Sequence, residues 1–367
     1  MAYKYTHFIP QNTAPSGAKR IGVYDGNGNR VCTIPLGRLV QPTQEKLYSF
    51  GIVADCHLEN YRSDTISSYD KFDLALAFFK EHGCSFATHC GDLADYGFWY
   101  PSNTYQVSTY DPSSYEAYRR ICEDNNMPVY GCCGNHESYN GYDISKTYTD
   151  TYGANPSLVI NNLEKLQEYT GDGLHFAKAH ENGVFIFLGQ PTGNKPMSDE
   201  ALQWLYGTLE TNRNKRCFIY VHPHISNGNP NGMITSLDLF NNWGTKKTAF
   251  ESLLRHYKNT IVFHGHTHVA FECQEVDEGT IYTDKDGYRS VSVPSSCKPR
   301  YIVNGSLTTY YDKSQGILVD VYDDCIVLNG VDFIRNEYVP IGTYKIDTPL
   351  QTIEANTFTD STGTITT

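Results

Sequence analysis

The stretch LYSFGIVADCH, residues 47–57, runs from apolar side chains into a polar end. An apolar run of this length is typical of a strand that is buried on both faces of a sheet. The same pattern returns in CSFATHCGDLAD (84–95) and in MPVYGCCGNHES (127–138). Between the first two lies SSYDKFDLALAFFKEHG (67–83), whose apolar residues and terminal glycine predict a helix. The order strand, helix, strand indicates parallel strands with helices packed outside the sheet.

The second half of the chain repeats this order. Buried strands are predicted in GVFIFLG (183–189), RCFIYVHPH (216–224) and TIVFHGHTH (260–268). Helices are predicted at 198–212, where Ser198 is a candidate N-cap, and at 245–259. The alternation of strands and helices predicts an α/β protein.

Polar clusters end five of the predicted strands. They are Asp55–His57, Asp92–Asp95, Asn135–Glu137, His222–His224 and His266–His268. Loops at the carboxyl ends of strands build the site in open α/β sheets, so we expect these clusters to meet. Carboxylate, amide and imidazole ligands together suit Mn, Fe, Zn, Ni or Co. A carboxylate shared by two such ions would hold them roughly 3.5–4 Å apart, which suits displacement at phosphorus.

The charge balance narrows the classes of partner. The 367 residues carry 41 acidic and 29 basic side chains, for a formal net charge of -12. This argues against a generic nucleic-acid binder, which would show a basic face. Bound cations would let an acidic chain accept an anionic substrate.

The expected location rests on the first residues and the cysteines. The start of the chain lacks the apolar core of a secretory signal, and no apolar run approaches the roughly 18 residues that span a bilayer. The 11 cysteines form no C-x-x-C pair, which argues against a zinc ribbon or a thioredoxin-type pair. Their odd number, without a leader, predicts reduced thiols and a cytoplasmic location. Cys132 and Cys133, which precede GNHE, are predicted to be packing residues. A viral particle or a cell surface stays open as a location.

Three segments are predicted along the chain. Residues 1–46 form an appendage, in which IGVYDGNGNRVCTIPL (21–36) predicts a β-hairpin. Residues 47–340 form the main domain, and 341–367 form a Thr-rich tail. Either terminal segment could attach the chain to a protein partner, and the oligomeric state stays open.

The motifs DCH, GDLAD, GNHE, HPH and GHTH, in this order, resemble the five signatures of the calcineurin-like metallophosphoesterase superfamily. The resemblance covers about 47–270 directly, and it extends into the β-rich stretch to about 335. It implies a four-layer αββα sandwich, in which two mixed sheets are flanked by helices and a dinuclear metal site lies at the strand ends. One departure is plain: the purple acid phosphatase branch has Tyr at the position of Asp95, so we expect no iron–tyrosinate centre.

The resemblance also implies the roles of individual residues. It assigns one metal ion to Asp55, His57, Asp92 and His268, and the other to Asp92, Asn135, His222 and His266. A hydroxide that bridges the ions would attack phosphorus. His136 would donate a proton near the leaving group, and Asp95 would orient a ligand or His136. His224 remains a rival of His222 for the ligand position.

Three long loops are predicted to project over the metal face, at 95–115, 138–153 and 225–236. In one interpretation they select the substrate by contact with particular side chains: Phe98, Trp99, Tyr100, Tyr139 and His224. In the other they pack on one another and only shape the rim. Long loops over active sites are commonly functional.

The resulting hypothesis is a dinuclear metal-dependent hydrolase of phosphate esters, either a monoesterase or a diesterase. A small or nucleotide-like substrate is favoured. The alternatives are a nuclease of the same fold and a non-catalytic scaffold. No ligand position is missing from the five motifs, which argues against the scaffold.

Overall fold

The computed structural model describes most of the main domain and part of each terminal segment. The described residues are 20–24, 30–35, 42, 44–58, 66–94, 114–138, 167, 172–189, 198–225, 245–272, 282–283, 287–303, 306–348, 352–355 and 358.

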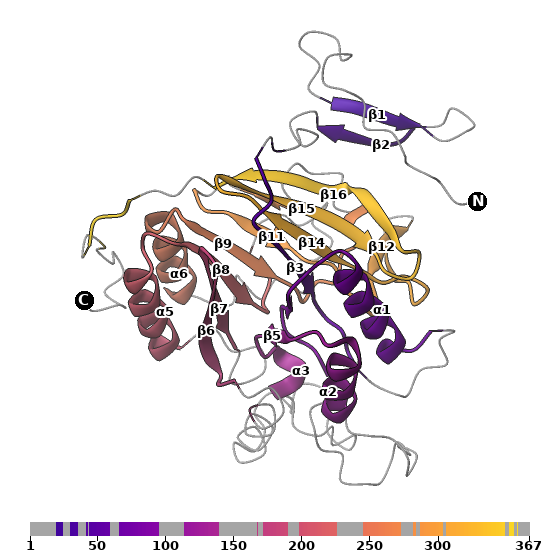
Figure 1. The fold of residues 1–367 in the computed structure, drawn as a ribbon, viewed down its shortest axis with the longest axis horizontal. Helices are drawn as coiled ribbons and strands as arrows, with labels where there is room; N and C mark the ends of the chain where they lie inside the picture. The colour runs from indigo at the N-terminus through magenta and orange to yellow at the C-terminus, as the bar shows by residue number, and fades with distance from the viewer. Residues whose placement is uncertain are drawn as a thin grey trace.

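Two six-stranded mixed sheets form the centre of the molecule (Figure 1). The first has the order β16-β15-β14-β3-β4-β5. Its parallel strands are β3 (Tyr48–Val53), β4 (Ala87–His89) and β5 (Val129–Gly131). Its antiparallel strands are β14 (Gln315–Val321), β15 (Cys325–Asp332) and β16 (Glu337–Asp347). The sequence predicted the parallel half from its apolar runs.

The second sheet has the order β10-β11-β9-β8-β7-β6. Its four parallel strands are β7 (Gly183–Leu188), β8 (Arg216–Val221), β9 (Thr260–His264) and β11 (Ser290–Ser292). Antiparallel strands flank them: β6 (His175–His180) and β10 (Tyr282–Thr283).

Helices cover the outer faces of both sheets. α1 (Ser68–Glu81) and α2 (Ser114–Asn125) lie against the first sheet, and α5 (Asp199–Thr211) and α6 (Thr245–His256) lie against the second (Figure 1). Ser67 caps α1 in a capping box with Asp70, and the predicted cap Ser198 accepts a hydrogen bond from the Ala201 amide. Both helices therefore begin where the sequence predicts.

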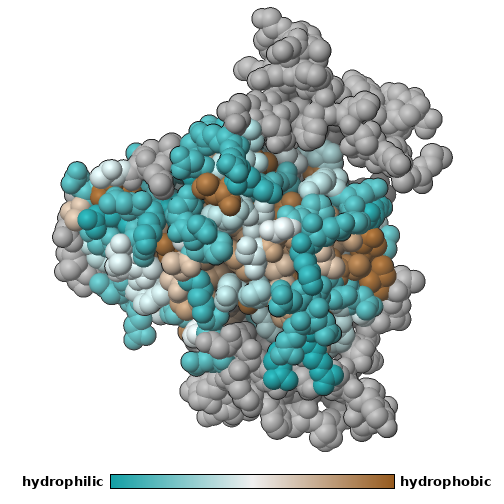
Figure 2. Space-filling view, in the orientation of Figure 1, coloured by the Kyte–Doolittle hydropathy of each residue, from teal (hydrophilic) through white to brown (hydrophobic). Residues whose placement is uncertain are grey.

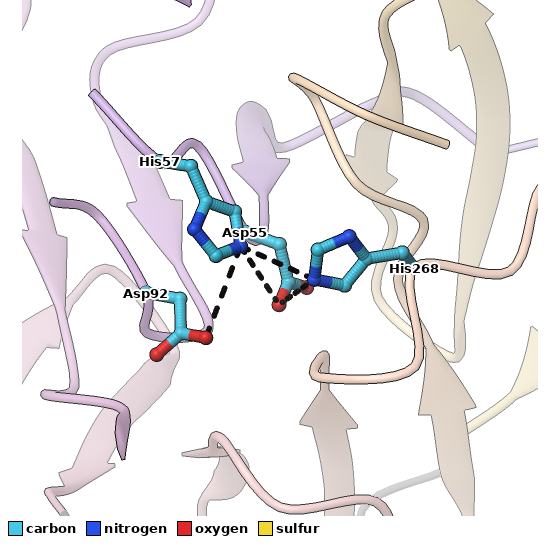
Figure 3. A group of neighbouring side chains, drawn as sticks. All are labelled: Asp55, His57, Asp92 and His268. Atoms are coloured by element: carbon cyan, nitrogen blue, oxygen red, sulfur yellow. Dashed lines mark hydrogen bonds and ion pairs between the residues drawn. The ribbon is translucent and has the colours of Figure 1, made fainter. Parts of the chain in front are cut away.

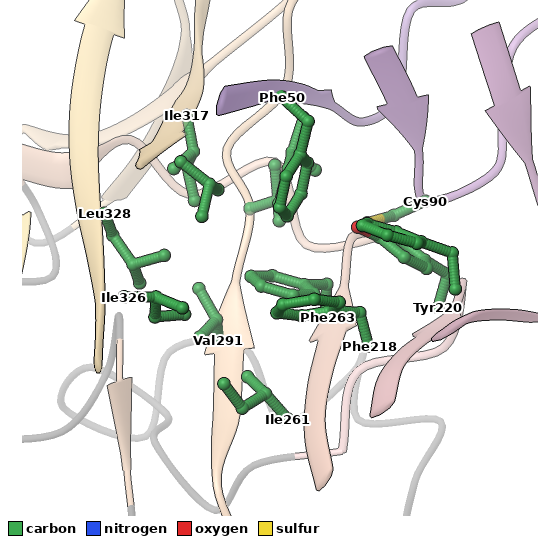
Figure 4. Packing of buried hydrophobic residues seen from close by; sticks show 14 of the residues in the cluster. Phe50, Cys90, Phe218, Tyr220, Ile261, Phe263, Val291, Ile317, Ile326 and Leu328 are labelled. Atoms are coloured by element: carbon green, nitrogen blue, oxygen red, sulfur yellow. The ribbon is translucent and has the colours of Figure 1, made fainter. Parts of the chain in front are cut away.

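Three layers of buried apolar side chains separate these elements. The central layer lies between the sheets and contains Phe50, Phe218, Val291 and Ile317 from both of them (Figure 4). The other two layers pack α1 and α2 on one sheet and α5 and α6 on the other. Three layers of core require four layers of structure, so the predicted αββα sandwich is confirmed.

The terminal segments carry further structure. β1 (Arg20–Tyr24) and β2 (Arg30–Pro35) form the predicted antiparallel hairpin, and β2 contacts β16. β16 runs past residue 340, where the sequence placed the start of the tail, because it pairs with β15 as far as Asp347. Further on, Phe358 is buried against α5 and α6, so part of the predicted tail packs on its own chain. The division into three segments otherwise stays a prediction.

The described part of the surface is largely hydrophilic on the face in Figure 2. None of the helices that the structure describes is long and apolar enough to cross a membrane. A second, smaller hairpin, β12 (Arg300–Val303) and β13 (Ser306–Thr309), follows the second sheet.

Candidate metal centre

Five loops meet where the two sheets present their strand ends. Three follow β3, β4 and β5 of the first sheet, and two follow β8 and β9 of the second. The carboxyl ends of parallel strands lie at one edge of a sheet, so each sheet delivers its polar loops to one side. A single helical turn, α3 (Asn135–Ser138), begins in the loop after β5. The tertiary structure thus places the predicted clusters in one region.

The first group of side chains contains two carboxylates and two imidazoles: Asp55, His57, Asp92 and His268 (Figure 3). One ligand atom of each lies within 4.8 Å of the others, and all four residues are buried. His268 Nε2 lies 3.1 Å from Asp55 Oδ1 and 3.2 Å from His57 Nε2. His57 Nε2 lies 3.9 Å from Asp92 Oδ2. A single ion could contact all four side chains.

The second group shares Asp92 and adds His222, His266 and Asn135. His222 Nε2 lies 3.1 Å from Asp92 Oδ2, 3.1 Å from His266 Nδ1 and 2.9 Å from Asn135 Oδ1. Asn135 Oδ1 also lies 3.0 Å from His266 Nδ1. The structure therefore brings together all seven residues that the sequence analysis assigned to metal. Asp92 lies between the two groups, as a bridging carboxylate must.

Hydrogen bonds orient the rings of this centre. His222 Nδ1 donates to the Cys90 carbonyl at 2.8 Å, and His268 Nδ1 donates to the Lys298 carbonyl at 3.4 Å. A carbonyl can only accept, so these nitrogens carry protons and Nε2 is left to face the centre. His266 differs, because it is the Nδ1 atom of its ring that faces His222 and Asn135.

The backbone takes the left-handed conformation at Asp55, His57, Asp92, His266 and His268, with φ between 45° and 73°. Few residues other than glycine adopt this region, and each such residue carries a conformational cost. Strain of this kind concentrates at functional sites. The surrounding hydrogen bonds must therefore hold these loops in place.

Two glycines let the loops approach one another. A Cβ atom added to Gly134 would lie 2.2 Å from Asp92 Oδ1 and 2.5 Å from the Asp92 amide nitrogen. One added to Gly91, whose φ is +89°, would lie 2.7 Å from His222 Nδ1. The glycines of GDLAD and GNHE are thus required because the neighbouring ligands occupy the space of a side chain.

Electrostatics within the centre favour a cation. Burial alone would raise the pKa of Asp92, yet His222 and His136 hold it well below its usual range. Burial opposes the charged form of His222, but Asp92 raises its pKa to about 9. The imidazole of His222 and the carboxylate of Asp92 therefore favour each other's charged forms across the 3.1 Å that separates Nε2 from Oδ2. A metal ion bound between these atoms would compete with protonation of His222.

Glu137 joins two of the ligand loops. Its buried carboxylate accepts from the amides of Asp92 at 3.0 Å, Ala94 at 2.9 Å and Gly134 at 2.6 Å. Burial and the nearby Asp92 carboxylate raise its pKa to about 7. The ligand sets predicted from the sequence do not include Glu137. The three bonds show that it shapes the loop around Asp92.

His136 and His224 differ in exposure. The His136 side chain is 20% exposed, and its Nε2 lies 3.8 Å from Asp92 Oδ2. Its ring packs edge-on against His57, and its backbone amide donates to Asp92 Oδ1 at 2.9 Å. His224 is 4% exposed, packs edge-on against His264 and belongs to neither ligand group. Of these two histidines, only His136 lies both beside Asp92 and open to solvent.

Five predicted site residues lie outside the described part of the chain: Asp95, Phe98, Trp99, Tyr100 and Tyr139. Their roles therefore stay predictions. Cys132 and Cys133 are buried in two different core layers and belong to neither ligand group.

Sequence reasoning missed the segment SSCKPR, residues 295–300, which follows β11. It contacts the loops of Asp55 and His268 through both side-chain and backbone groups. No motif marked it, because its contacts to the centre use a serine hydroxyl and backbone groups that many sequences could supply.

The donor set of this centre fits transition-metal ions. It comprises two carboxylates, one amide oxygen and four imidazoles, which together suit Mn, Fe, Zn, Ni or Co. The residues could hold two ions that share Asp92.

Comparisons with known proteins identify a family and a similar fold. The sequence profile of the calcineurin-like phosphoesterase family matches residues 48–270. No curated protein matches the sequence. A purple acid phosphatase from yellow lupin (Lupinus luteus) seeds is similar in structure, with a TM-score of 0.54 and 12% identity. The match covers 90% of this chain but only 59% of the lupin chain, and at this identity it shows the fold alone.

Two more distant structures also match. One is a predicted phosphoesterase from Streptococcus pneumoniae, with a TM-score of 0.34 and 10% identity over 84% of this chain and 99% of that one. The other is Vacuolar Protein Sorting 29 from Cryptosporidium parvum, with a TM-score of 0.36 and 9% identity. The match covers 83% of this chain and 100% of that one.

Proposed function

We propose that this chain, which belongs to the calcineurin-like phosphoesterase family and is a metal-dependent phosphoesterase, hydrolyses small phosphate esters with two metal ions held around Asp92. One observation carries the proposal. Asp92 lies in both ligand groups, and the partly exposed His136 lies beside it. Two ions that share one carboxylate form the arrangement suited to displacement at phosphorus.

The proposed ligands divide as the two groups do. Asp55, His57 and His268 would hold one ion, and Asn135, His222 and His266 would hold the other, with Asp92 common to both. When bound, these ions would acidify a water molecule and neutralise the charge of the phosphate.

The residues of the chain perform the remaining steps. In the overall reaction, water oxygen forms a new bond to phosphorus and the bond from phosphorus to the ester oxygen breaks. His136 would donate a proton to that departing oxygen, because its ring is open to solvent and its main chain is fixed on Asp92. Asp95 is proposed to orient His136 or a ligand. These steps leave an alcohol and a phosphate as products.

The class of substrate is part of the proposal. A net charge of -12 disfavours long polyanions, which supports a small phosphate ester over nucleic acid. Phe98, Trp99, Tyr100 and Tyr139 are proposed to contact the organic group of the substrate. His224 is a less suitable contact because it is buried.

The test is to strip the full chain of metal, reload it with Mn²⁺ and measure bound metal together with turnover. We expect two ions per chain and hydrolysis of p-nitrophenyl phosphate, bis-p-nitrophenyl phosphate or both. A chain that binds no Mn²⁺ would contradict the proposed centre. A chain that binds two ions yet hydrolyses neither these esters nor a panel of nucleotides would favour the scaffold alternative. Faster cleavage of single-stranded DNA than of any small ester would favour the nuclease.

A further inference from the structure

The segment 295–300 ties the two sheets together beside the ligand loops. The Ser296 amide donates to the Ala54 carbonyl at 2.9 Å, directly before Asp55. The Gln315 amide, at the start of β14, donates to the Ser295 carbonyl at 3.2 Å. The segment therefore connects the end of β11 in one sheet to β3 and β14 in the other.

Ser295 is the centre of this segment. Its buried hydroxyl donates to the main-chain carbonyl of Asp55 at 2.8 Å. The same oxygen accepts from the amides of Cys297 at 3.1 Å and Lys298 at 2.9 Å. These three bonds use the donor and both acceptor positions of a hydroxyl. Ser295 thereby fixes the backbone of Asp55, which is in the costly left-handed conformation with φ 49°.

The other end of the segment holds His268. The Lys298 carbonyl accepts from His268 Nδ1 at 3.4 Å, and the Arg300 amide donates to the His268 carbonyl at 2.7 Å. The first contact turns Nε2 toward the centre, and the second supports a backbone with φ 60°. Since Ser295 also binds the Lys298 amide, the hydroxyl that holds Asp55 helps to place the carbonyl that orients His268.

Lys71 anchors the segment from helix α1. Its side chain is almost fully buried, and its ammonium donates to the carbonyls of Cys297 at 2.7 Å and Tyr311 at 2.5 Å. A buried ammonium is costly to desolvate, so it is kept in place by the groups that accept its hydrogen bonds. Lys71 thus fixes the part of the segment that lies between Ser295 and Lys298.

None of the hydrogen bonds described for this segment reaches Asn135, His222 or His266. In that group, His222 is oriented by Cys90 at the end of β4, and the backbone amide of His266 is held by the Asp55 carboxylate at 3.0 Å. The two ligand groups share Asp92, and the Asp55 carboxylate links them through the His266 amide, but the segment itself contacts only the group of Asp55 and His268. A defect in the segment should therefore weaken the binding of the ion at Asp55, His57 and His268 more than the binding of the other ion.

We propose that Ser295 and Lys71 are positioning residues for the metal subsite of Asp55, His57 and His268, and that they set the affinity of this subsite separately from that of the other. The inference rests on the proposed two-ion function, and it adds which residues determine the difference between the two ions. Outer partners of metal ligands typically contribute about 10–100-fold to metal affinity.

The experiment compares Ser295→Ala with Ser290→Ala by calorimetric Mn²⁺ titration of the full chain, together with metal content after gel filtration. Ser290 is also buried, lies on β11 shortly before the segment, and its hydroxyl has no hydrogen-bond partner within the described residues. We expect Ser295→Ala to keep one ion at the wild-type affinity and to bind the other about 10–100-fold more weakly. Ser290→Ala should bind both as the wild type does.

Two more variants distinguish a selective loss of metal affinity from a general loss of stability. Ser295→Thr keeps the hydroxyl and should restore both affinities, and Lys71→Met should repeat the selective loss without touching a ligand. Thermal melts of the metal-free proteins report any global defect. Wild-type affinity for both ions in Ser295→Ala and Lys71→Met would overturn the inference, as would equal weakening of both ions. A wild-type chain that binds two ions without hydrolysis would instead refute the proposed function and leave these comparisons valid.

Discussion

The two ligand groups of the centre share Asp92 but are built differently. The group of Asp55, His57 and His268 faces the centre with Nε2 nitrogens and a carboxylate, and the segment 295–300 supports it. The group of Asn135, His222 and His266 uses an amide oxygen and one Nδ1 nitrogen, and Asp92, 3.1 Å from His222 Nε2, raises the pKa of His222 to about 9. The segment 295–300 orients the first group, whereas Cys90 and Asp92 orient His222 in the second. We therefore expect changes at Asp92, or at residues that hold its loop, to affect both groups, and changes in the segment 295–300 to separate them.

The largest effect is expected for Asp92→Asn. An amide cannot offer two ions the negative charge that a shared carboxylate supplies, so both affinities should fall by more than the roughly 10–100-fold typical of outer partners. Turnover should be lost with them. Metal content after gel filtration and Mn²⁺ titration measure the effect. Two ions retained at wild-type affinity would show that Asp92 does not bridge.

The second-largest effect is expected for His136→Ala, which should lower turnover without a loss of metal binding. We expect kcat to fall by about 10²–10⁴-fold because a general acid is lost, while both ions stay bound. The fall should be smaller for p-nitrophenyl phosphate than for an alkyl phosphate, since p-nitrophenolate leaves readily without a proton. Loss of metal from this variant, or equal loss with both esters, would contradict the assigned role.

Removal of the metal should lower the stability of the fold. An ion present at 100 times its dissociation constant stabilises the native state by about 2.7 kcal/mol, and a second ion adds to this. Thermal melts with and without a chelator should therefore differ in the wild type. The difference should be about half as large in Ser295→Ala at an Mn²⁺ concentration that fills only the tighter site. An unchanged melt after complete metal removal would show that the ligand loops are stable alone.

The smallest effect is expected for Glu137→Gln. Glu137 accepts three backbone hydrogen bonds, whereas a glutamine would turn its NH₂ group toward at least one of these donors. We expect the free energy of unfolding of the metal-free chain to fall by about 1–3 kcal/mol, measured with urea. Because Glu137 supports Asp92, both ion affinities should weaken together, unlike in Ser295→Ala. Selective loss of one ion would show that Glu137 belongs to one group only.

The parts of the site that could be predicted all follow an apolar run in the sequence. Apolar runs such as those before Asp55 and Asp92 indicate buried strands, and topology then brings their carboxyl ends together. The motifs GNHE and GHTH likewise follow predicted strands, and the structure has Asn135 and His266 in the connections after β5 and β9. Local pattern and global topology agree at these positions, so the five polar clusters could be predicted from the residues, and the family resemblance then indicated which seven of their residues would be ligands.

The parts that could not be predicted depend on contacts between distant segments. Glu137 gains its role only because the loop after β4 lies against it, and Lys71 only because α1 packs beside the segment 295–300. The extent of β16 past residue 340 is a similar case, since pairing with β15 decides where that strand ends. None of these positions carries a motif.

The sequence by itself determined the α/β alternation, the kinds of ligand and the order in which they occur, because these follow from local patterns of apolar and polar residues. Only the tertiary structure decided which ring nitrogen faces the centre, which loops are held in the left-handed conformation and which residues support each ion. These features arise from hydrogen bonds between residues as far apart as Asp55 and Ser295, which form only once the two sheets have packed together. Short motifs therefore determine which ligands the site contains, and the packed fold determines how those ligands are oriented.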